Sequence, residues 1–320
     1  MKLFKTMDKL QLIEEIKRLK AEKNAVILAH YYTIGDIQDI ADFVGDSLAL
    51  AQKAAVSDAD MIVMCGVHFM GETCKILCPK KKVLVPDLAA GCSLADSCPA
   101  DDFGEFVRQH PGYTVLSYVN TTAAVKYYTD IVVTSGNALK IVNSLPEEEK
   151  IIFAPDRNLG SYINAVTGRD MLLWDGACHV HEQFSTEAIL KLKAEHPEAK
   201  VLVHPECKRP VVLLADKVGS TAVLLKYAVE SEDQEFIVAT ESGILHEMQR
   251  QAPLKTFIPV PPEVSEGSIG CSCNECAYMR LNTLEKLYAC LRDETPEIIV
   301  DENIIERAKL PIDRMLELSK

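Results

Sequence analysis

The sequence contains one pattern three times, and this repetition constrains the fold more than any other feature. Each copy opens with a short apolar run that ends in polar side chains: Val26 to His30, Val115 to Tyr118, and Val201 to His204. A hydroxyl residue follows seventeen positions after the end of each run, at Ser47, Ser135 and Thr221. Because self-similarity of this kind indicates matched structural units, we interpret the chain as three copies of one unit.

Two further apolar runs follow in each copy. The second runs are Met61 to Met64, Ile151 to Ala154, and Phe236 to Ala239. The third runs are Val83 to Val85, Met171 to Trp174, and Thr256 to Ile258. Short apolar runs that alternate with helical stretches are typical of parallel strands covered by helices. We therefore predict an α/β fold of three pseudo-symmetric repeats, each a small parallel sheet covered by helices, around a central site.

The predicted domains follow from the repeats. Residues 1–110 form the first α/β repeat with an N-terminal helix, 111–196 the second repeat, and 197–283 the third; residues 284–320 are C-terminal helices that pack back on the first repeat. Within the first repeat, residues 8–22 and 67–77 carry helical patterns. Residues 36–54 are predicted as one helix that is interrupted near Gly45.

Charge and cysteine content exclude several classes of protein. The net charge is −13, and the 34 Lys and Arg are dispersed among 47 Asp and Glu, which argues against nucleic acid or a membrane surface as a partner. No apolar run approaches the roughly 18 residues that span a bilayer, and the N-terminal stretch lacks a signal-peptide core. We therefore expect a cytoplasmic protein, in which the 11 cysteines serve as metal ligands or catalytic thiols rather than disulfides.

A cysteine follows the third run of each copy, at Cys92, Cys178 and Cys276. Three thiols from equivalent places suggest three ligands that meet on a pseudo-threefold axis. Structural zinc prefers four closed ligands, whereas three thiolates suit a 4Fe-4S cluster in which one iron lacks a protein ligand. Such an open iron can bind substrate and act as a Lewis acid. The prediction is one cluster per chain.

The other cysteines leave alternatives open. An isolated cysteine is more often a small buried residue than a ligand. Cys98 is close enough to Cys92 for either to be the first ligand, and Cys271 and Cys273 beside Cys276 could form a redox-active pair or lie in a loop. Cys74 and Cys78 share a helix face and could pair on a metal, although core filling is the favoured interpretation for them. The remaining cysteines are interpreted as core residues: Cys65, Cys207 and Cys290.

Polar residues at the strand ends complete the predicted site: His30, Tyr31, Tyr32, Tyr118, Asn120, His204 and Glu206. Ligands of open α/β sheets bind beyond the carboxyl ends of the strands, so these side chains should share a cavity with the cysteines. His, Tyr and Glu are suited to proton transfer.

The Ser47, Ser135 and Thr221 segments precede helical stretches and could bind anions there, although each alone is typical of an ordinary N-cap. A structural role is expected for His110, His179, His196 and His246.

Several longer motifs resemble the quinolinate synthase family, and the similarity covers nearly the whole chain. They include Leu28-Ala29-His30-Tyr31-Tyr32, Asp42 to Ser47, Tyr118-Val119-Asn120, Pro155 to Gly160, Gly176 to His181, His204 to Cys207, Val218 to Thr221, and Met279 to Leu284. The resemblance implies an enzyme of NAD biosynthesis that condenses iminosuccinate with dihydroxyacetone phosphate to quinolinate. An aspartate oxidase or dehydrogenase would supply the iminosuccinate.

The resemblance also implies roles for residues of this chain. Cys92, Cys178 and Cys276 would hold one 4Fe-4S cluster, whose open iron binds substrate. Substrate contacts would come from His30, Ser47, Tyr118, Asn120, Ser135, His204, Glu206 and Thr221. Proton transfer is assigned to Tyr32, Tyr118, His204 and Glu206. One departure is the spacing Cys271-x-Cys273-x2-Cys276, where many relatives have Cys-x2-Cys-x2-Cys. A regulatory disulfide in this segment is therefore in doubt.

Three rival interpretations remain at the level of the sequence. The first is a cluster-dependent hydro-lyase that acts on another small polycarboxylate and needs no phosphate contact. The second is a non-enzymatic iron-sulfur protein, which usually supplies four thiolates and little polar machinery. The third is a zinc protein.

Overall fold

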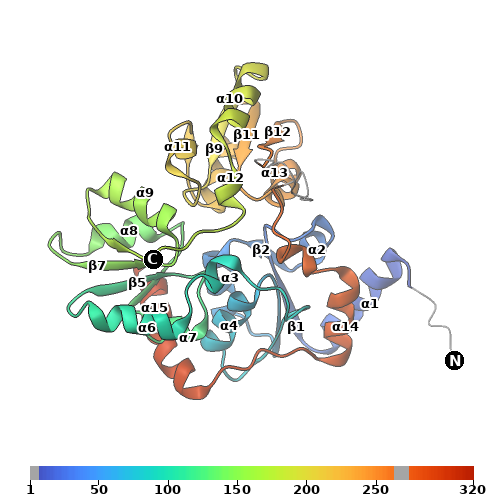
Figure 1. Cartoon of the computed structure of the whole chain (residues 1–320). Helices are drawn as coiled ribbons and strands as arrows, with labels where there is room; N and C mark the ends of the chain where they lie inside the picture. Colours follow the sequence, from blue (N-terminus) through green and yellow to red (C-terminus); the bar gives the residue numbers. More distant parts are fainter. Residues whose placement is uncertain (1–6, 263–273) are drawn as a thin grey trace, which may run out of the picture.

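A computed structural model describes residues 7–262 and 274–320 of the chain. Within these residues the strands form three parallel sheets of four strands each (Figure 1). The first sheet has the order β2-β1-β3-β4, built from Phe43–Gly45, Ala25–His30, Met61–Cys65 and Lys82–Leu84. The second, β6-β5-β7-β8, comprises Ile131–Val133, Thr114–Tyr118, Ile151–Ala154 and Leu172–Leu173. The third, β10-β9-β11-β12, comprises Lys217–Val218, Lys200–Val203, Glu235–Ala239 and Thr256–Pro259.

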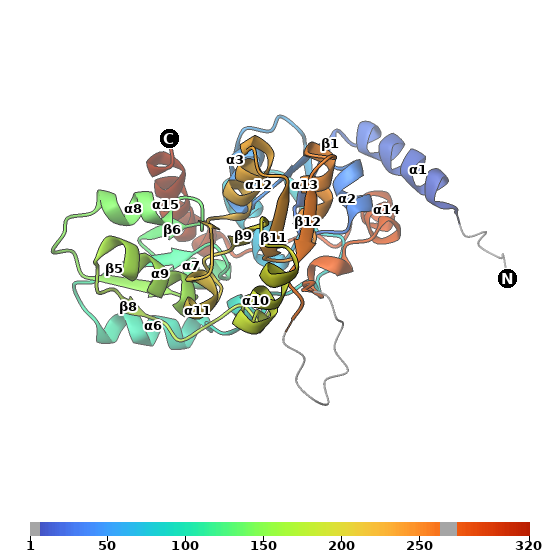
Figure 2. The ribbon, with the colours of Figure 1, turned by 90° about the horizontal axis from the view of Figure 1, so that it is seen from above.

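Helices cover the sheets, and the three sheets form three lobes around a common centre (Figures 1 and 2). The first part of the chain contains α1 (Lys9–Glu22), α2 (Gly35–Ile40), α3 (Ser47–Ala55), α4 (His68–Leu77), α5 (Ser93–Asp96) and α6 (Ala100–Gln109). The second sheet is accompanied by α7 (Ala123–Lys126), α8 (Ala138–Ser144) and α9 (Arg157–Thr167). The third is accompanied by α10 (Thr186–Glu195), α11 (Arg209–Val212), α12 (Thr221–Glu230) and α13 (Ile244–Gln251). The predicted α/β class and its three repeats are confirmed.

The two terminal regions pack on different parts of the molecule. Helix α1 starts with a capping box, in which Asp8 accepts the N–H of Gln11 at 2.9 Å and the Gln11 side chain accepts the N–H of Asp8 at 3.1 Å. It packs against β1 and against α14 (Leu284–Asp293). The last helix, α15 (Glu302–Leu318), packs against β6, α7 and α4. The four domain ranges stay a prediction.

Each sheet contains one strand that the sequence did not indicate: β2, β6 and β10. These edge strands have only two or three residues, too few to show a period of two. The predicted interruption of the 36–54 helix near Gly45 is confirmed, with the second piece starting at Ser47, but the interruption is larger than predicted because strand β2 separates α2 from α3. The apolar residues on both sides of β2 imitate the stripe of a single helix.

An aspartate before each of these edge strands makes the same contact in all three sheets. Its carboxylate accepts a backbone N–H from the neighbouring strand, at 2.8 to 2.9 Å. The pairs are Asp42 with Ile27, Asp130 with Val115, and Asp216 with Val201. The N–H of each aspartate also donates to the carbonyl oxygen of the same strand residue at 2.9 Å. The repeats thus share a fixed way of attaching the edge strand.

The strand interiors form the core. Fully buried residues occur on consecutive positions of the central strands, as in Ile27-Leu28-Ala29 and Ile152-Phe153-Ala154. Parallel strands covered by helices on both faces require such continuous apolar runs. The polar residues that follow β1, β5 and β9 therefore lie where the apolar runs end, at the carboxyl edge of each sheet.

Candidate active site

One cavity lies where the carboxyl edges of the three sheets meet, and all predicted catalytic, substrate-binding and cluster residues line it. They are His30, Tyr32, Ser47, Cys92, Tyr118, Asn120, Ser135, Cys178, His204, Glu206, Thr221 and Cys276. Three ends of central strands, three helix-start segments and three cysteine loops thus converge, as the repeats require. The described residues that line the cavity include no Lys or Arg. An anionic ligand would therefore be held by hydroxyl, amide and imidazole groups and by any metal centre bound there.

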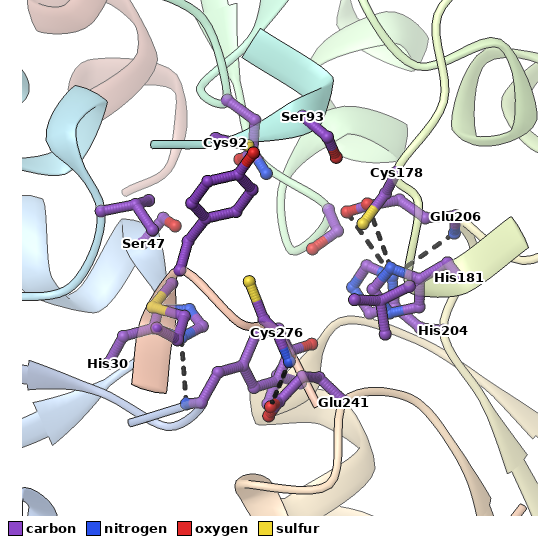
Figure 3. Close-up of a pocket in the computed structure, with 18 of the residues that line it drawn as sticks. His30, Ser47, Cys92, Ser93, Cys178, His181, His204, Glu206, Glu241 and Cys276 are labelled. Atoms are coloured by element: carbon purple, nitrogen blue, oxygen red, sulfur yellow. Dashed lines mark hydrogen bonds and ion pairs between the residues drawn. The ribbon is translucent and has the colours of Figure 1, made fainter. Parts of the chain in front are cut away.

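The three cysteines approach the cavity from different loops, and Figure 3 shows their sulfur atoms on its walls. Cys92 immediately precedes α5, Cys178 lies in the loop after β8, and Cys276 lies ahead of the short helical turn Met279–Leu281. Burial raises the pKa of Cys92 to about 12 and raises the pKa values of Cys178 and Cys276. Thiolates in this place need a compensating cation, which a metal centre supplies.

The remaining described cysteines lie elsewhere. Cys98, the alternative to Cys92, is buried in an apolar cluster with Phe103 and does not line the cavity. Cys65, Cys74, Cys78, Cys207 and Cys290 are also buried outside the lining. The structure therefore favours Cys92 over Cys98 as the thiol of the first repeat. Cys271 and Cys273 lie outside the described residues, so the redox-pair hypothesis stays untested.

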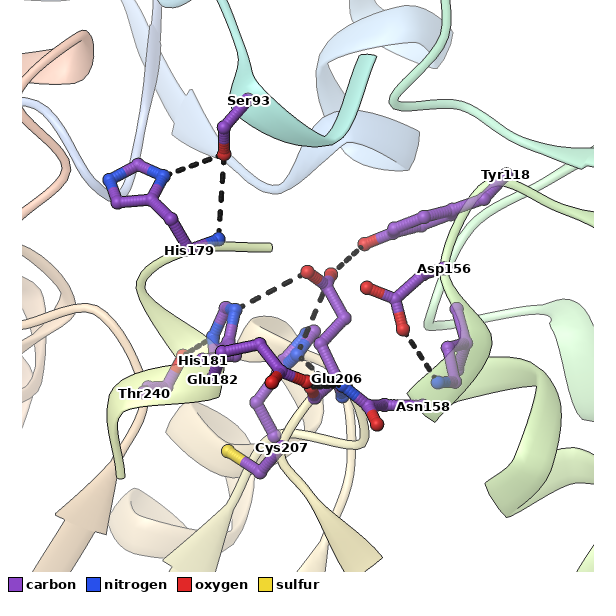
Figure 4. Close-up of polar contacts among 12 residues, drawn as sticks. Ser93, Tyr118, Asp156, Asn158, His179, His181, Glu182, Glu206, Cys207 and Thr240 are labelled. Carbon is purple, nitrogen blue, oxygen red and sulfur yellow. Dashed lines mark hydrogen bonds and ion pairs between the residues drawn. The ribbon is translucent and has the colours of Figure 1, made fainter. Parts of the chain in front are cut away.

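Glu206 is the centre of the polar side of the cavity (Figure 4). Its carboxylate accepts the phenol O–H of Tyr118 at 2.6 Å and lies 3.3 Å from Nδ1 of His181. Nδ1 of His204 is 3.7 Å away. Burial alone would raise the pKa of Glu206, but these neighbours lower it to about 2. This carboxylate is ionised and accepts hydrogen bonds, but a pKa so far below neutral makes it a weak base until a bound substrate displaces some of these partners, because general-base catalysis works best near the working pH.

The two histidines at strand ends are neutral. Burial lowers the pKa values of His30 and His204 to about 3. Nδ1 of His30 accepts the N–H of Tyr32 at 3.2 Å, which fixes the orientation of the ring. Neutral imidazoles beside an ionised carboxylate can donate or accept a hydrogen bond without adding a charge.

Tyr32 connects the first sheet with the third. Its hydroxyl group is 2.7 Å from Oγ1 of Thr221 and 2.9 Å from Oγ1 of Thr240. Thr240 in turn is 3.0 Å from Nε2 of His181, which belongs to the loop after β8. One chain of hydrogen bonds therefore joins loops from all three sheets. Burial raises the pKa of Tyr32 well above its usual value, so this hydroxyl keeps its proton.

The predicted anion-binding hydroxyls of the first and third repeats are not helix caps. Helix α3 is capped by Asp46, which accepts the N–H of Ala49 at 3.0 Å, and α12 by Ser220, which accepts the N–H of Val223 at 3.4 Å. Ser47 and Thr221 are the next residues along the chain, and both line the cavity. Because a neighbour performs the capping, the ordinary N-cap interpretation does not apply to these two hydroxyls.

Several residues in the walls were missed from the sequence. His181 and Glu241 line the cavity, and Thr240 lies behind it in contact with Tyr32 and His181. His181 is the last residue of the motif Gly176 to His181 but was given no role, and no motif contained Thr240 or Glu241. His179, interpreted as structural, lies in the wall with Nδ1 2.6 Å from Oγ of Ser93. The other three histidines of that group do lie outside the lining, with partners of their own: His110 with the carbonyl of Phe106, His196 with Glu235, and His246 with Asp39.

A mononuclear metal site is the main geometric alternative. The ligand atoms of Cys178, His181 and Glu206 lie within 4.8 Å of one another. Two further thiols line the same cavity, however, and His181 and Glu206 already contact each other. Among the described residues the sulfur atoms of Cys92, Cys178 and Cys276 do not form a group within 4.8 Å of one another, so the three thiols fit a multinuclear iron-sulfur centre better than a single zinc ion.

Comparison with known proteins identifies the family. Residues 14–317 match the family model described as "Quinolinate synthetase A protein". The quinolinate synthase of Microcystis aeruginosa is 58% identical over 308 residues, which cover 96% of this chain and 95% of that protein. That of Trichodesmium erythraeum is 57% identical over 308 residues, covering 96% and 94%. That of Chloroherpeton thalassium is 55% identical over 314 residues, covering 98% and 96%. The chain belongs to the quinolinate synthase family.

Membership of the quinolinate synthase family confirms the resemblance and the predicted enzyme class in NAD biosynthesis. It also implies an iron-sulfur cofactor in general, which the thiols in the cavity fit. The family acts on small molecules, in agreement with a cavity lined by thiol, hydroxyl, imidazole and carboxyl groups among apolar side chains. Among the described residues, no helix is both long and apolar enough to cross a membrane.

Proposed function

We infer that this chain forms quinolinate from iminosuccinate and dihydroxyacetone phosphate, with loss of phosphate and water. The observation that carries the proposal is the joint presence, in one cavity, of three thiols from three repeats and a buried, ionised Glu206 beside Tyr118. The thiols fit a metal centre, and the carboxylate fits the proton transfers that a condensation with several dehydrations needs. An electron carrier would not require the carboxylate, and a hydro-lyase would not require contacts for a second, phosphorylated substrate.

Cys92, Cys178 and Cys276 would hold one 4Fe-4S cluster, with one iron free of protein ligands. When bound, this group supplies a Lewis acid that favours the loss of water. Three thiolate ligands leave that position open, whereas four would close it.

The chain's own residues account for the proton transfers. Glu206 accepts a proton from substrate carbon, because its carboxylate is ionised and faces the cavity. Tyr118 and Tyr32 are protonated and are assigned to proton transfer as well; a bound substrate would take over the Tyr118 O–H that now donates to Glu206. His204 is also assigned to proton transfer: burial holds it neutral, and Nδ1 accepts the backbone N–H of Glu206 at 3.4 Å, so Nε2 is the nitrogen that can serve a substrate.

Substrate binding is assigned to the hydroxyl, amide and imidazole groups of the walls. Ser47 and Thr221 stand at the first positions of α3 and α12, where backbone N–H groups favour anions. Ser135 precedes α8 on the wall formed with Tyr118 and Asn120, and His30 faces it from the first sheet. These groups match the carboxylates of iminosuccinate and the phosphate of the second substrate. Supply of iminosuccinate by an aspartate oxidase or dehydrogenase, and a cytoplasmic location, remain predictions.

The test is an anaerobic assay of the reconstituted protein with both substrates, with quinolinate measured by chromatography. Product that depends on the cluster and on each substrate supports the proposal. The same assay with either substrate omitted, or with the apo-protein, is the control. No quinolinate from protein that carries a full cluster would contradict the proposed reaction and favour a hydro-lyase.

A further inference from the structure

The turn after β11, Thr240 to Gly243, contacts the segment that carries Cys276. Oε1 of Glu241 accepts the backbone N–H of Cys276 at 3.0 Å (Figure 3). Its other carboxylate oxygen accepts the N–H of Gly243 at 2.7 Å. The N–H of Ser242 also donates to the carbonyl of Asn274 at 3.0 Å. The Glu241 side chain is 1% exposed, so its oxygen atoms depend on protein partners: these two backbone N–H groups and the Arg280 guanidinium, 3.6 Å from Oε1.

A carboxylate stands at the equivalent place in the second repeat. Strand register matches Ala239 with Val203 in the third sheet and Ala154 with Ser117 in the second. Two residues beyond these alanines are Glu241 and Asp156. Asp156 is fully buried and accepts backbone N–H groups from Leu159, at 2.7 Å, and from Cys178. In two of the three repeats, therefore, the same position binds the main chain of the cysteine that faces the cavity.

The first repeat uses the main chain instead. Its register pairs Ala29 with Cys65, which places Val67 at the equivalent position. The next residue, His68, donates its N–H to the carbonyl of Ala90 at 2.7 Å, two residues before Cys92. In all three repeats, the residues that follow β3, β7 or β11 hold the cysteine loop of the same repeat. Only the second and third repeats do so through a buried carboxylate.

We propose that Glu241 is a positioning residue for the cluster, which holds Cys276 in place through its backbone N–H and slows the loss of iron. This inference rests on the proposed function. Outer partners that orient metal ligands typically change metal affinity by about 10- to 100-fold when they are removed. Asp156 has the corresponding role for Cys178, but it also caps α9, so Glu241 gives the cleaner test.

The experiment compares iron release from anaerobically reconstituted holoenzyme into a strong iron chelator, followed by absorbance. Glu241→Leu removes both acceptor oxygens. Glu241→Asp keeps a carboxylate that can still reach the nearby Gly243 N–H but is one methylene too short for Cys276. Glu247→Leu is the matched control, because Glu247 is also buried, at 4% side-chain exposure, yet pairs with Arg250 outside the cavity.

Both Glu241 variants should release iron about 10-fold faster or more, with a changed electron paramagnetic resonance spectrum of the reduced cluster. Glu247→Leu should keep the wild-type release rate and spectrum, even where it lowers the melting temperature. Wild-type release rates in Glu241→Asp, or equally fast release in Glu247→Leu, would overturn the proposal. If Glu241→Leu does not fold, the Asp variant decides alone. A wild-type protein that binds no cluster would instead refute the proposed function.

Discussion

The residues that start the edge strands are the same in all three repeats, whereas the residues at the carboxyl ends of the central strands differ between repeats. At the start of the edge strands, Asp42, Asp130 and Asp216 make the same pair of hydrogen bonds in every sheet. At the carboxyl ends, equivalent positions carry His30, Tyr118 and His204. The aspartates therefore maintain the sheets, whereas the residues at the carboxyl ends differ and supply the different chemical groups of one shared cavity. The comparison separates residues that stabilise the fold from residues that perform the chemistry.

Loss of a cysteine from the shared cavity should have the largest effect. Cys178→Ala should abolish both the cluster and quinolinate formation, because the cavity loses one of its three thiols. Iron and sulfide per chain and the quinolinate assay measure the two effects. Cys98→Ala, which removes a buried thiol outside the cavity, is the control and should keep both. A full 4Fe-4S cluster in the Cys178 variant would refute its assignment as a ligand.

Removal of the central carboxylate should separate catalysis from cluster binding. Glu206→Gln should keep the cluster and lower kcat by about 10²- to 10⁴-fold, because a neutral amide cannot accept the substrate proton. Steady-state kinetics and the cluster absorbance measure this. Glu247→Gln alters a buried carboxylate outside the cavity and should leave kcat unchanged. Wild-type kcat in the Glu206→Gln variant would show that the base lies elsewhere.

Acid should destabilise the site through its neutral histidines. The pKa of His204 is about 3 in the folded protein and about 6.5 when unfolded. The unfolded chain therefore binds more protons between these values, so the free energy of unfolding falls as the pH falls from 6.5 towards 3. Between pH 6.5 and pH 5, the free energy of unfolding should therefore fall by about 1–2 kcal/mol less in His204→Gln than in the wild type.

Denaturant titrations at several pH values measure the effect on His204→Gln and the wild type. His196→Gln, which alters a histidine outside the cavity, is the control. An unchanged pH dependence in the His204 variant would mean that this histidine is charged in the folded protein.

Substitutions at the invariant end of the repeats should have the smallest effect. Asp130→Ala removes the acceptor of the Val115 N–H and should lower the free energy of unfolding by about 1–2 kcal/mol. Asp42→Ala and Asp216→Ala should cost similar amounts, and none should change cluster content or kcat. Chemical denaturation and the activity assay test both parts. A large loss of activity in a variant of normal stability would contradict the division between the two ends.

Repetition made much of the site predictable from the sequence, whereas contacts between the sheets could not be predicted. The repeat identified the strand-end residues, the hydroxyls at one common offset and the cysteine after each third run, and the structure places them in one cavity. His181 and Thr240 could not be found in this way, because their contact joins loops from two different sheets. The edge strands were missed because they are too short to show a period. Alignment of the repeats would have shown Glu241 and Asp156 at one offset, so that signal was present in the sequence.

The central claim is that the three repeats each provide one thiol to a single cluster with an open iron. Mössbauer spectroscopy of the iron-57 holoenzyme, with and without a substrate analogue, tests it most directly. The account predicts a 4Fe-4S spectrum in which a single iron site changes when the analogue binds. A cluster whose iron sites are all unaffected by the analogue, or a protein that retains zinc in place of iron, would contradict it.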